Sequence, residues 1–158
     1  MLTLVCFCLV GASAQVSDSF LVPIPVDSLA AWVARNPSTI ARAAGSQVLW
    51  RRGNQFAVSR RTPRGEVRAV MQDEIQRVQG GYRYTCNLVH GSSSEVESYR
   101  LDCTLTQARI GQSLLSIRVQ SSVSLRVRDF QLERQMRQSV EKVRQLFESL
   151  TPNDRRAK

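Results

Sequence analysis

The sequence predicts an α+β domain in which an antiparallel sheet of about seven strands packs its apolar face on one long C-terminal helix, with two short helices after the first strand. Three observations predict this class. Apolar and polar residues alternate through most of residues 47–125, which is the period of half-buried strands. After Asp129 the apolar residues recur every three or four positions, which is the period of a helix. A chain of 158 residues has the length of one domain with a single core.

The first elements are a strand over residues 19–24 and two short helices. Asp27 is placed to cap the first helix, because its carboxylate can accept a hydrogen bond from a backbone N–H in the first turn. Pro37 breaks that helix, and Ser38 can cap a second one that ends at Gly45.

The rest of the chain predicts six strands and the long helix. Each strand is a run of period two bounded by turn residues, and the six runs cover Gln47 to Arg51, Gln55 to Arg61, Val67 to Gln76, Tyr82 to Leu88, Tyr99 to Leu105 and Leu115 to Leu125. Pro152 ends the terminal helix. The apolar stripe of that helix consists of Leu132, Met136, Val140, Val143, Phe147 and Leu150.

The N-terminus has the features of an export signal. An apolar run from Leu2 to Val10 is followed by the small residues Ala12-Ser13-Ala14, which a signal peptidase accepts. We therefore expect residues 1–14 to be a cleaved signal peptide and the protein to be secreted or periplasmic. No basic residue precedes the run, so the alternatives are a poorly defined start of the chain or a cytosolic tail. The run is too short to span a membrane.

Removal of residues 1–14 would leave two cysteines, Cys86 and Cys103, in an oxidising compartment. Alternation turns both toward the apolar side. An antiparallel register that pairs Cys86 with Cys103, and Tyr84 with Leu105, keeps the apolar residues on that side and puts the turn in the segment GSSSEV. Directly opposed strand residues are close enough for a disulfide, which we therefore expect. Two buried free thiols are the alternative.

The sequence argues against thiol, zinc and phosphate-loop chemistry. His90, the only histidine, lies four strand residues from Cys86, which is about 13 Å and too far to activate a thiol. One histidine and two cysteines do not make the usual zinc sets, and no glycine-rich phosphate loop occurs. We expect no metal and no cofactor.

Two segments resemble a known superfamily. The opening segment FLVPIPVDSLAAWVARNPSTIAR and the closing segment VEKVRQLFESL are similar to those of START-like, or SRPBCC, helix-grip proteins, which include polyketide cyclases. The resemblance runs from about Ser17 to Leu150. It implies a curved sheet wrapped on the terminal helix, with an apolar cavity between them. The chain then divides into a signal peptide (1–14), a START-like domain (15–151) and a basic C-terminal tail (152–158).

Alternation assigns the residues that would line such a cavity. The alternative for each of them is ordinary core. Asp73 is different, because a carboxylate on an apolar strand face must be paired, hydrogen-bonded or near the rim. It either forms a salt bridge with an arginine such as Arg109, or it orients a ligand or acts as a base. The expected ligand-binding residues are Trp50, Met71, Asp73, Tyr82, Tyr84 and Met136.

The chain carries a net charge of +9, which favours an anionic partner without identifying one. The outward face of the sheet carries about one arginine per strand but no interleaved aromatic residues, so nucleic acid is disfavoured. An anionic lipid or polymer surface fits better, and a solvated face is the alternative. These arginines are Arg68, Arg83, Arg100, Arg118 and Arg126.

We expect an exported monomer that binds one small apolar or amphipathic molecule, lipid or isoprenoid-like, between the sheet and the C-terminal helix, without catalysis. One alternative is a cyclase- or hydrolase-type enzyme that uses Asp73 with a tyrosine. The other is a basic adaptor for an anionic surface.

Overall fold

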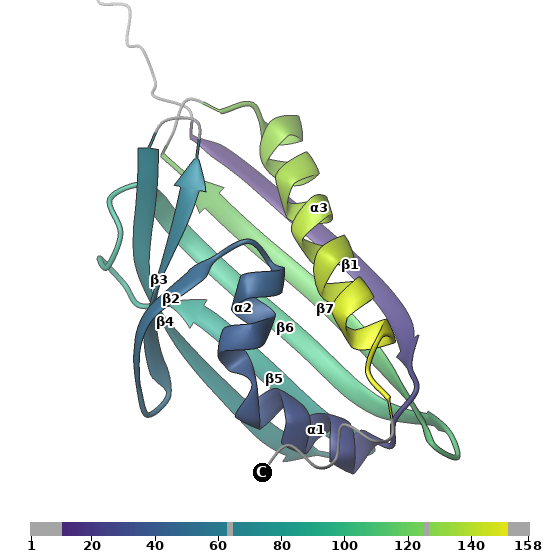
Figure 1. Cartoon of the computed structure of the whole chain (residues 1–158). Coiled ribbons are helices and arrows are strands. Elements are labelled where there is room, and N and C mark those ends of the chain that lie inside the picture. The colour runs from purple at the N-terminus through teal and green to yellow at the C-terminus, as the bar shows by residue number, and fades with distance from the viewer. Residues whose placement is uncertain (1–10, 63–64, 125–126, 152–158) are drawn as a thin grey trace, which may run out of the picture.

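A computed structural model gives the fold and describes residues 11–62, 65–124 and 127–151. Within these residues three helices lie on one face of a curved, antiparallel sheet of seven strands (Figure 1). The spatial order is β1-β7-β6-β5-β4-β3-β2, so β1 and β2 are the edges. The predicted fold class is confirmed. The elements are β1 (Ala12–Val22), α1 (Val26–Arg35), α2 (Pro37–Ala43), β2 (Gln47–Arg52), β3 (Gln55–Thr62), β4 (Gly65–Val78), β5 (Gly81–Leu88), β6 (Val96–Arg109), β7 (Gln112–Val123) and α3 (Asp129–Glu148).

Strand β1 begins seven residues earlier than the sequence predicts, at Ala12 instead of Ser19. Its first half consists of Ala, Ser, Gln and Val, whose weak alternation gives little strand signal, but it pairs with β7 along its whole length. A cleavage after Ala14 would fall inside this strand and would remove the buried Ala12. Residues 1–10 of the expected signal peptide and the tail 152–158 lie outside the described residues, so the cleavage stays a prediction.

The two short helices begin differently from the prediction. α1 starts at Val26 with Pro25 at its N-cap, and Asp27 lies in the first turn, where its carboxylate accepts a hydrogen bond from the Tyr82 hydroxyl at 2.7 Å. α2 starts at Pro37, so Ser38 is not its cap. Proline at the first helical position needs no N–H partner, which explains how both helices begin beside a proline.

The long helix α3 confirms the predicted stripe. Its buried residues are Leu132, Met136, Val140, Val143 and Phe147, and Leu150 just beyond it is buried as well. The helix lies along β1 (Figure 1). Near its C-terminus the ring of Phe147 packs edge-on against Trp32 of α1, with ring centroids 5.4 Å apart. The same ring lies 6.3 Å from Phe20 of β1, so Phe147 joins helix α3 to α1 and the sheet.

The predicted register of the cysteine hairpin is wrong by two residues. Cys86 pairs with Leu101 and Cys103 with Tyr84, so the two cysteines are diagonal neighbours on one face. Diagonal side chains lie roughly 7–8 Å apart, farther than a disulfide allows. Both cysteines are free, buried thiols. A slip of two residues leaves every side chain on its own face, so alternation alone does not distinguish the two registers.

Candidate functional site

The candidate site lies on the inner face of the sheet, which is the face that the three helices cover. The helices cover this face unevenly. On β6 the inner residues Leu105 and Cys103 are buried, because α1 packs over that end of the central strands. The next inner residues along β6, Leu101 and Tyr99, are only half-buried, although β6 lies well inside the sheet. Solvent therefore reaches the inner face beyond α1.

The half-buried apolar residues of this region come from four strands. We call them the uncovered inner surface, and they are Val48 of β2, Val58 of β3, Leu88 of β5, and Tyr99 and Leu101 of β6. All five pack against the buried core.

A buried polar cluster lies beside this surface. The Asp73 carboxylate is 5% exposed and accepts two hydrogen bonds from the Arg51 guanidinium, at 3.1 and 2.8 Å. The Tyr84 hydroxyl donates a third bond to it at 3.1 Å. Arg51 also lies 5.3 Å from the centre of the Phe56 ring. The charge of Asp73 on β4 is therefore compensated on the inner face by Arg51 of β2, two strands away. The predicted salt bridge between Asp73 and Arg109 is wrong, because Arg109 lies at the far end of β6.

Trp50 does not lie on the inner face as predicted. A bulge in β2 between Val48 and Trp50 reverses the alternation, so that Trp50 pairs with Ala57 and Arg51 pairs with Phe56. Arg51 consequently takes the inward position, and the Trp50 side chain is 41% exposed on the opposite face.

The other predicted ligand-binding residues do lie on the inner side. Met71, Tyr84 and Met136 are buried, the first two on adjacent strands and the third in the stripe of α3. Tyr82 is half-buried, and its hydroxyl is engaged by Asp27. The hydroxyls of Tyr82 and Tyr84 thus both have partners within the protein, which leaves neither of them free to orient a ligand.

Tyr99 offers a free hydroxyl that the sequence analysis did not include among the site residues. No side chain or backbone group of the described residues pairs with this hydroxyl. Because those residues contain no fully buried side-chain polar atom without a partner, the hydroxyl must reach accessible space. Desolvation by the surrounding protein raises the pKa of Tyr99, so the phenol stays neutral. Its place in the alternation of β6 was the signal that could have identified it.

Arg60 is the second polar group that the sequence analysis missed. It projects from the inner face of β3 toward the helices and donates hydrogen bonds to the Ala44 carbonyl, at 2.7 Å, and to Ser139 Oγ of α3. Within residues 11–62, 65–124 and 127–151 no carboxylate pairs with it. Arg60 on β3 and Tyr99 on β6 both lie on the inner face of the sheet, and the Arg60 charge slightly opposes the rise in the pKa of Tyr99 that burial causes.

The thiols are unsuited to nucleophilic chemistry. Burial, with a smaller effect of the neighbouring Asp73 charge, raises the pKa of Cys86 to about 12. Burial likewise raises the pKa of Cys103. Neither forms a thiolate near neutral pH, which is the form that attacks an electrophile or binds a metal. The described part of the chain also contains no cluster of side chains that could hold a metal ion.

Four of the five predicted arginines alternate with the buried inner residues of their strands and so lie on the outer face of the sheet: Arg68, Arg83, Arg100 and Arg118. Arg83 and Arg100 both bind the Asp102 carboxylate, and Arg68 pairs with Glu66. Desolvation alone would raise the pKa of Asp102, but the hydrogen bonds from the two arginines hold it below its ordinary value. Part of the positive charge of the outer face is therefore neutralised by neighbouring carboxylates. Arg126 lies outside the described residues.

Two hollows occur on the surface. A groove of about 780 Å³ runs between the outer edge of β1 and α3, and its lining mixes charges of both signs, with Asp18, Glu141, Arg137 and Lys142. A smaller hollow of about 350 Å³ lies over β4 and β5, and its lining includes Asp73 and Leu88 of the candidate site together with Glu74 and His90. Neither hollow includes Tyr99 or Leu101. No described helix is long and apolar enough to span a membrane.

The sequence matches no known family model and no curated protein. The structure is similar to a START superfamily protein from Mycobacterium smegmatis, with a TM-score of 0.65, 10% identity and coverage of 85% of this chain and 94% of that one. A protein from Thermus thermophilus has a TM-score of 0.64 at 12% identity, covering 85% and 94%. The Zhui aromatase/cyclase from Streptomyces sp. R1128 has a TM-score of 0.57 at 9% identity, covering 84% and 87%. At these identities the likeness concerns the fold, and the chain has the START-like helix-grip fold.

Proposed function

We propose that the protein binds one small apolar or amphipathic molecule on the uncovered inner surface, between the sheet and helices α2 and α3. The observation that carries the proposal is the half-burial of Tyr99 and Leu101 on an inner strand of the sheet. Core positions on an inner strand are normally sealed, and apolar area left in contact with water costs about 25 cal/mol per Å². A bound apolar molecule would recover that free energy. Lipid or isoprenoid-like molecules have the required chemistry.

The polar end of the ligand is proposed to bind Arg60 and the Tyr99 hydroxyl. These are the groups that flank the uncovered inner surface without a carboxylate partner of their own among the described side chains. A neutral phenol donates a hydrogen bond, and a guanidinium donates several, so both suit a carboxylate or hydroxyl oxygen. Such sites combine an apolar lining with a few polar groups that fix orientation.

Binding is favoured over catalysis by the state of Asp73. A general base needs a carboxylate that is free to take a proton. The Asp73 carboxylate instead accepts bonds from Arg51 and from Tyr84. Burial, and to a smaller extent the neighbouring Asp73 carboxylate, raises the pKa of Tyr84, so its phenol remains a donor to Asp73. This arrangement supports a structural role for Asp73 and Tyr84, the carboxylate and the tyrosine that a cyclase- or hydrolase-type enzyme would use.

Titration with a fluorescent fatty acid tests the proposal. Saturation at one molecule per chain is expected, and Leu101→Arg should weaken binding about tenfold or more, because a charge replaces apolar lining. Thr104→Arg is the matched control, since Thr104 lies on the same strand but is exposed on the outer face. Tyr99→Phe should weaken binding of the fatty acid more than binding of a hydrocarbon probe that lacks the carboxylate. Equal effects of Leu101→Arg and Thr104→Arg, or no uptake across lipids and isoprenoids, would refute the inner-surface site.

A further inference from the structure

One end of the sheet gathers exposed apolar side chains. In the described part of the chain six large hydrophobic residues are exposed, and three of them lie at this end: Leu21 at 50%, Val78 at 41% and Ile110 at 104%. Single exposed hydrophobic residues are ordinary on protein surfaces, but a group at one end is not.

The strand pairing places these residues relative to one another. Gly81, which pairs with Val78, also pairs with Thr106 of β6. Thr106 pairs with Leu114 of β7, and Leu114 pairs with Leu21 of β1. One row across adjacent strands of the sheet therefore holds Val78, Leu114 and Leu21 on its outer face. The β6–β7 hairpin continues beyond this row and carries Ile110 at its tip.

Ile110 is not required by the turn in which it lies. The turn depends on Gly111, whose φ of 77° few other residues adopt without strain. Polar residues are the ordinary choice beside such a glycine, because a hairpin tip is surrounded by water. A fully exposed isoleucine here has no packing partner among the described residues, so its apolar surface is available to something outside the chain.

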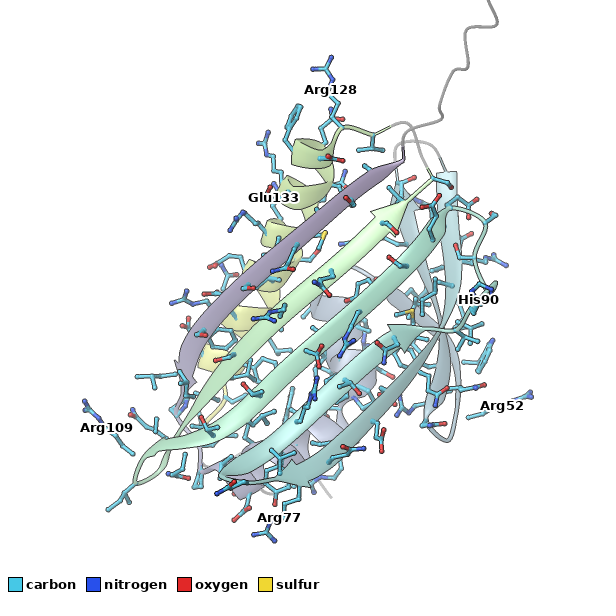
Figure 2. The ribbon with its side chains drawn as sticks, turned by 180° about the vertical axis from the view of Figure 1, so that it is seen from behind. Arg52, Arg77, His90, Arg109, Arg128 and Glu133 are labelled. Carbon is cyan, nitrogen blue, oxygen red and sulfur yellow. The ribbon has the colours of Figure 1, made fainter. Side chains whose placement is uncertain are left out.

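Two arginines accompany the apolar residues. Arg77 precedes Val78, Arg109 precedes Ile110, and Figure 2 shows both projecting from this end of the sheet. Neither arginine forms an ion pair within the described residues. The carboxylate of Asp27, in the first turn of α1 at this end, accepts a hydrogen bond from the Tyr82 hydroxyl. Because neither guanidinium is held in an ion pair by the part of the chain that the structure describes, both are available to an anionic partner outside the chain.

We propose that this end of the sheet docks on the surface of an anionic lipid bilayer. The docking end consists of Leu21, Arg77, Val78, Arg109 and Ile110. A projecting apolar tip with a cation immediately beside it matches the order of a bilayer surface, where acyl chains lie directly beneath headgroup phosphates. Ile110 inserts first, the outward row of Val78 and Leu21 follows, and the two guanidinium groups bind phosphate oxygens. The inference does not depend on the inner-face ligand.

Vesicle cosedimentation with the full chain tests the proposal. Vesicles of equal parts phosphatidylcholine and phosphatidylglycerol should bind the protein, and vesicles of phosphatidylcholine alone should bind it far less. The double variant Arg77→Gln with Arg109→Gln should weaken binding about thirtyfold, since each basic residue near an anionic surface contributes about 1 kcal/mol. Ile110→Ser should weaken it about tenfold, through the loss of buried apolar area.

The matched control removes two positive charges from other parts of the surface. Arg118 lies on the outer face of β7 and Arg134 on the exposed side of α3, and neither has an ion-pair partner among the described residues. The double variant Arg118→Gln with Arg134→Gln should weaken binding by less than about threefold, on the expectation that only contacting charges count fully. Melting curves check that every variant is folded. Equal losses in both double variants, or unchanged binding of Ile110→Ser, would overturn docking by this end.

Discussion

Replacing Asp73 by Asn tests whether the cluster on the inner face is a structural element or part of a catalytic site. The Asp73 side chain is 6% exposed, and the Arg51 side chain that binds it is 31% exposed. An asparagine has nearly the same shape and keeps one oxygen for the Tyr84 hydroxyl, but it removes the charge and replaces the other acceptor by an NH2 donor that faces Arg51. The change therefore breaks the ion pair without a large change of shape.

The expected cost follows from the burial of the two partners. A hydrogen bond to a charged group contributes about 1.5–3 kcal/mol, and the partial exposure of Arg51 lets water replace some of it. We expect Asp73→Asn to lower the free energy of unfolding by about 2 kcal/mol. For a chain of this size that corresponds to a fall in Tm of about 4–8 °C. Arg51→Met should cost more, about 3–5 kcal/mol, because it leaves a buried carboxylate without its cation.

Urea unfolding at neutral pH measures both variants. Glu66→Gln is the control, because the ion pair of Glu66 with Arg68 is exposed at both ends and should contribute far less to stability than the pair of Asp73 with Arg51. If Asp73→Asn costs no more than Glu66→Gln, the cluster does not stabilise the fold. A variant of unchanged stability that loses a measurable turnover would instead support the enzyme alternative.

Two further predictions concern the core. Phe147→Ala should lower the free energy of unfolding by about 3–5 kcal/mol in the same assay, because the ring is buried against Phe20 and Trp32. Glu141 is exposed, so Glu141→Ala should change the free energy of unfolding by less than about 1 kcal/mol. Similar costs of the two variants would contradict the assigned stripe. Cys86, whose pKa is raised to about 12, should resist alkylation at mildly alkaline pH in the folded chain and react readily once the chain is unfolded, as followed by mass spectrometry of labelled peptides. Rapid labelling of the native protein, or a peptide in which Cys86 is disulfide-linked, would contradict the buried free thiol.

The alternation of single residues carried most of the fold prediction. The inward positions of Met71, Asp73 and Tyr84 follow from period two, and the stripe of α3 follows from spacings of three and four. These patterns appear in the sequence because one side of each element is buried and the other is exposed to solvent. The sequence predicts too short a β1, because the small and polar first half of this strand gains its conformation from pairing with β7.

The candidate site was less predictable, because its members depend on partners that are distant in the sequence. A bulge in β2 exchanged the faces of Trp50 and Arg51, and no residue pattern within the strand signals it. The partner of Asp73 is consequently Arg51, which β3 and β4 bring into reach, and not Arg109. Alternation places Tyr99 on the correct face, but only the placement of the helices decides which inward residues are sealed and which meet solvent.

The sequence by itself determined which face of each strand and helix is apolar. The apolar residues recur every two positions in a strand and every three or four in a helix, so this pattern can be read within a single element. The tertiary structure decided the register of β5 on β6, in which a slip of two residues separates Cys86 from Cys103 without moving either to the other face. It also decided which inner residues the helices cover, because coverage depends on where α1, α2 and α3 pack across the sheet. Register and coverage are properties of pairs of elements, and each is fixed by the summed packing of many distant residues.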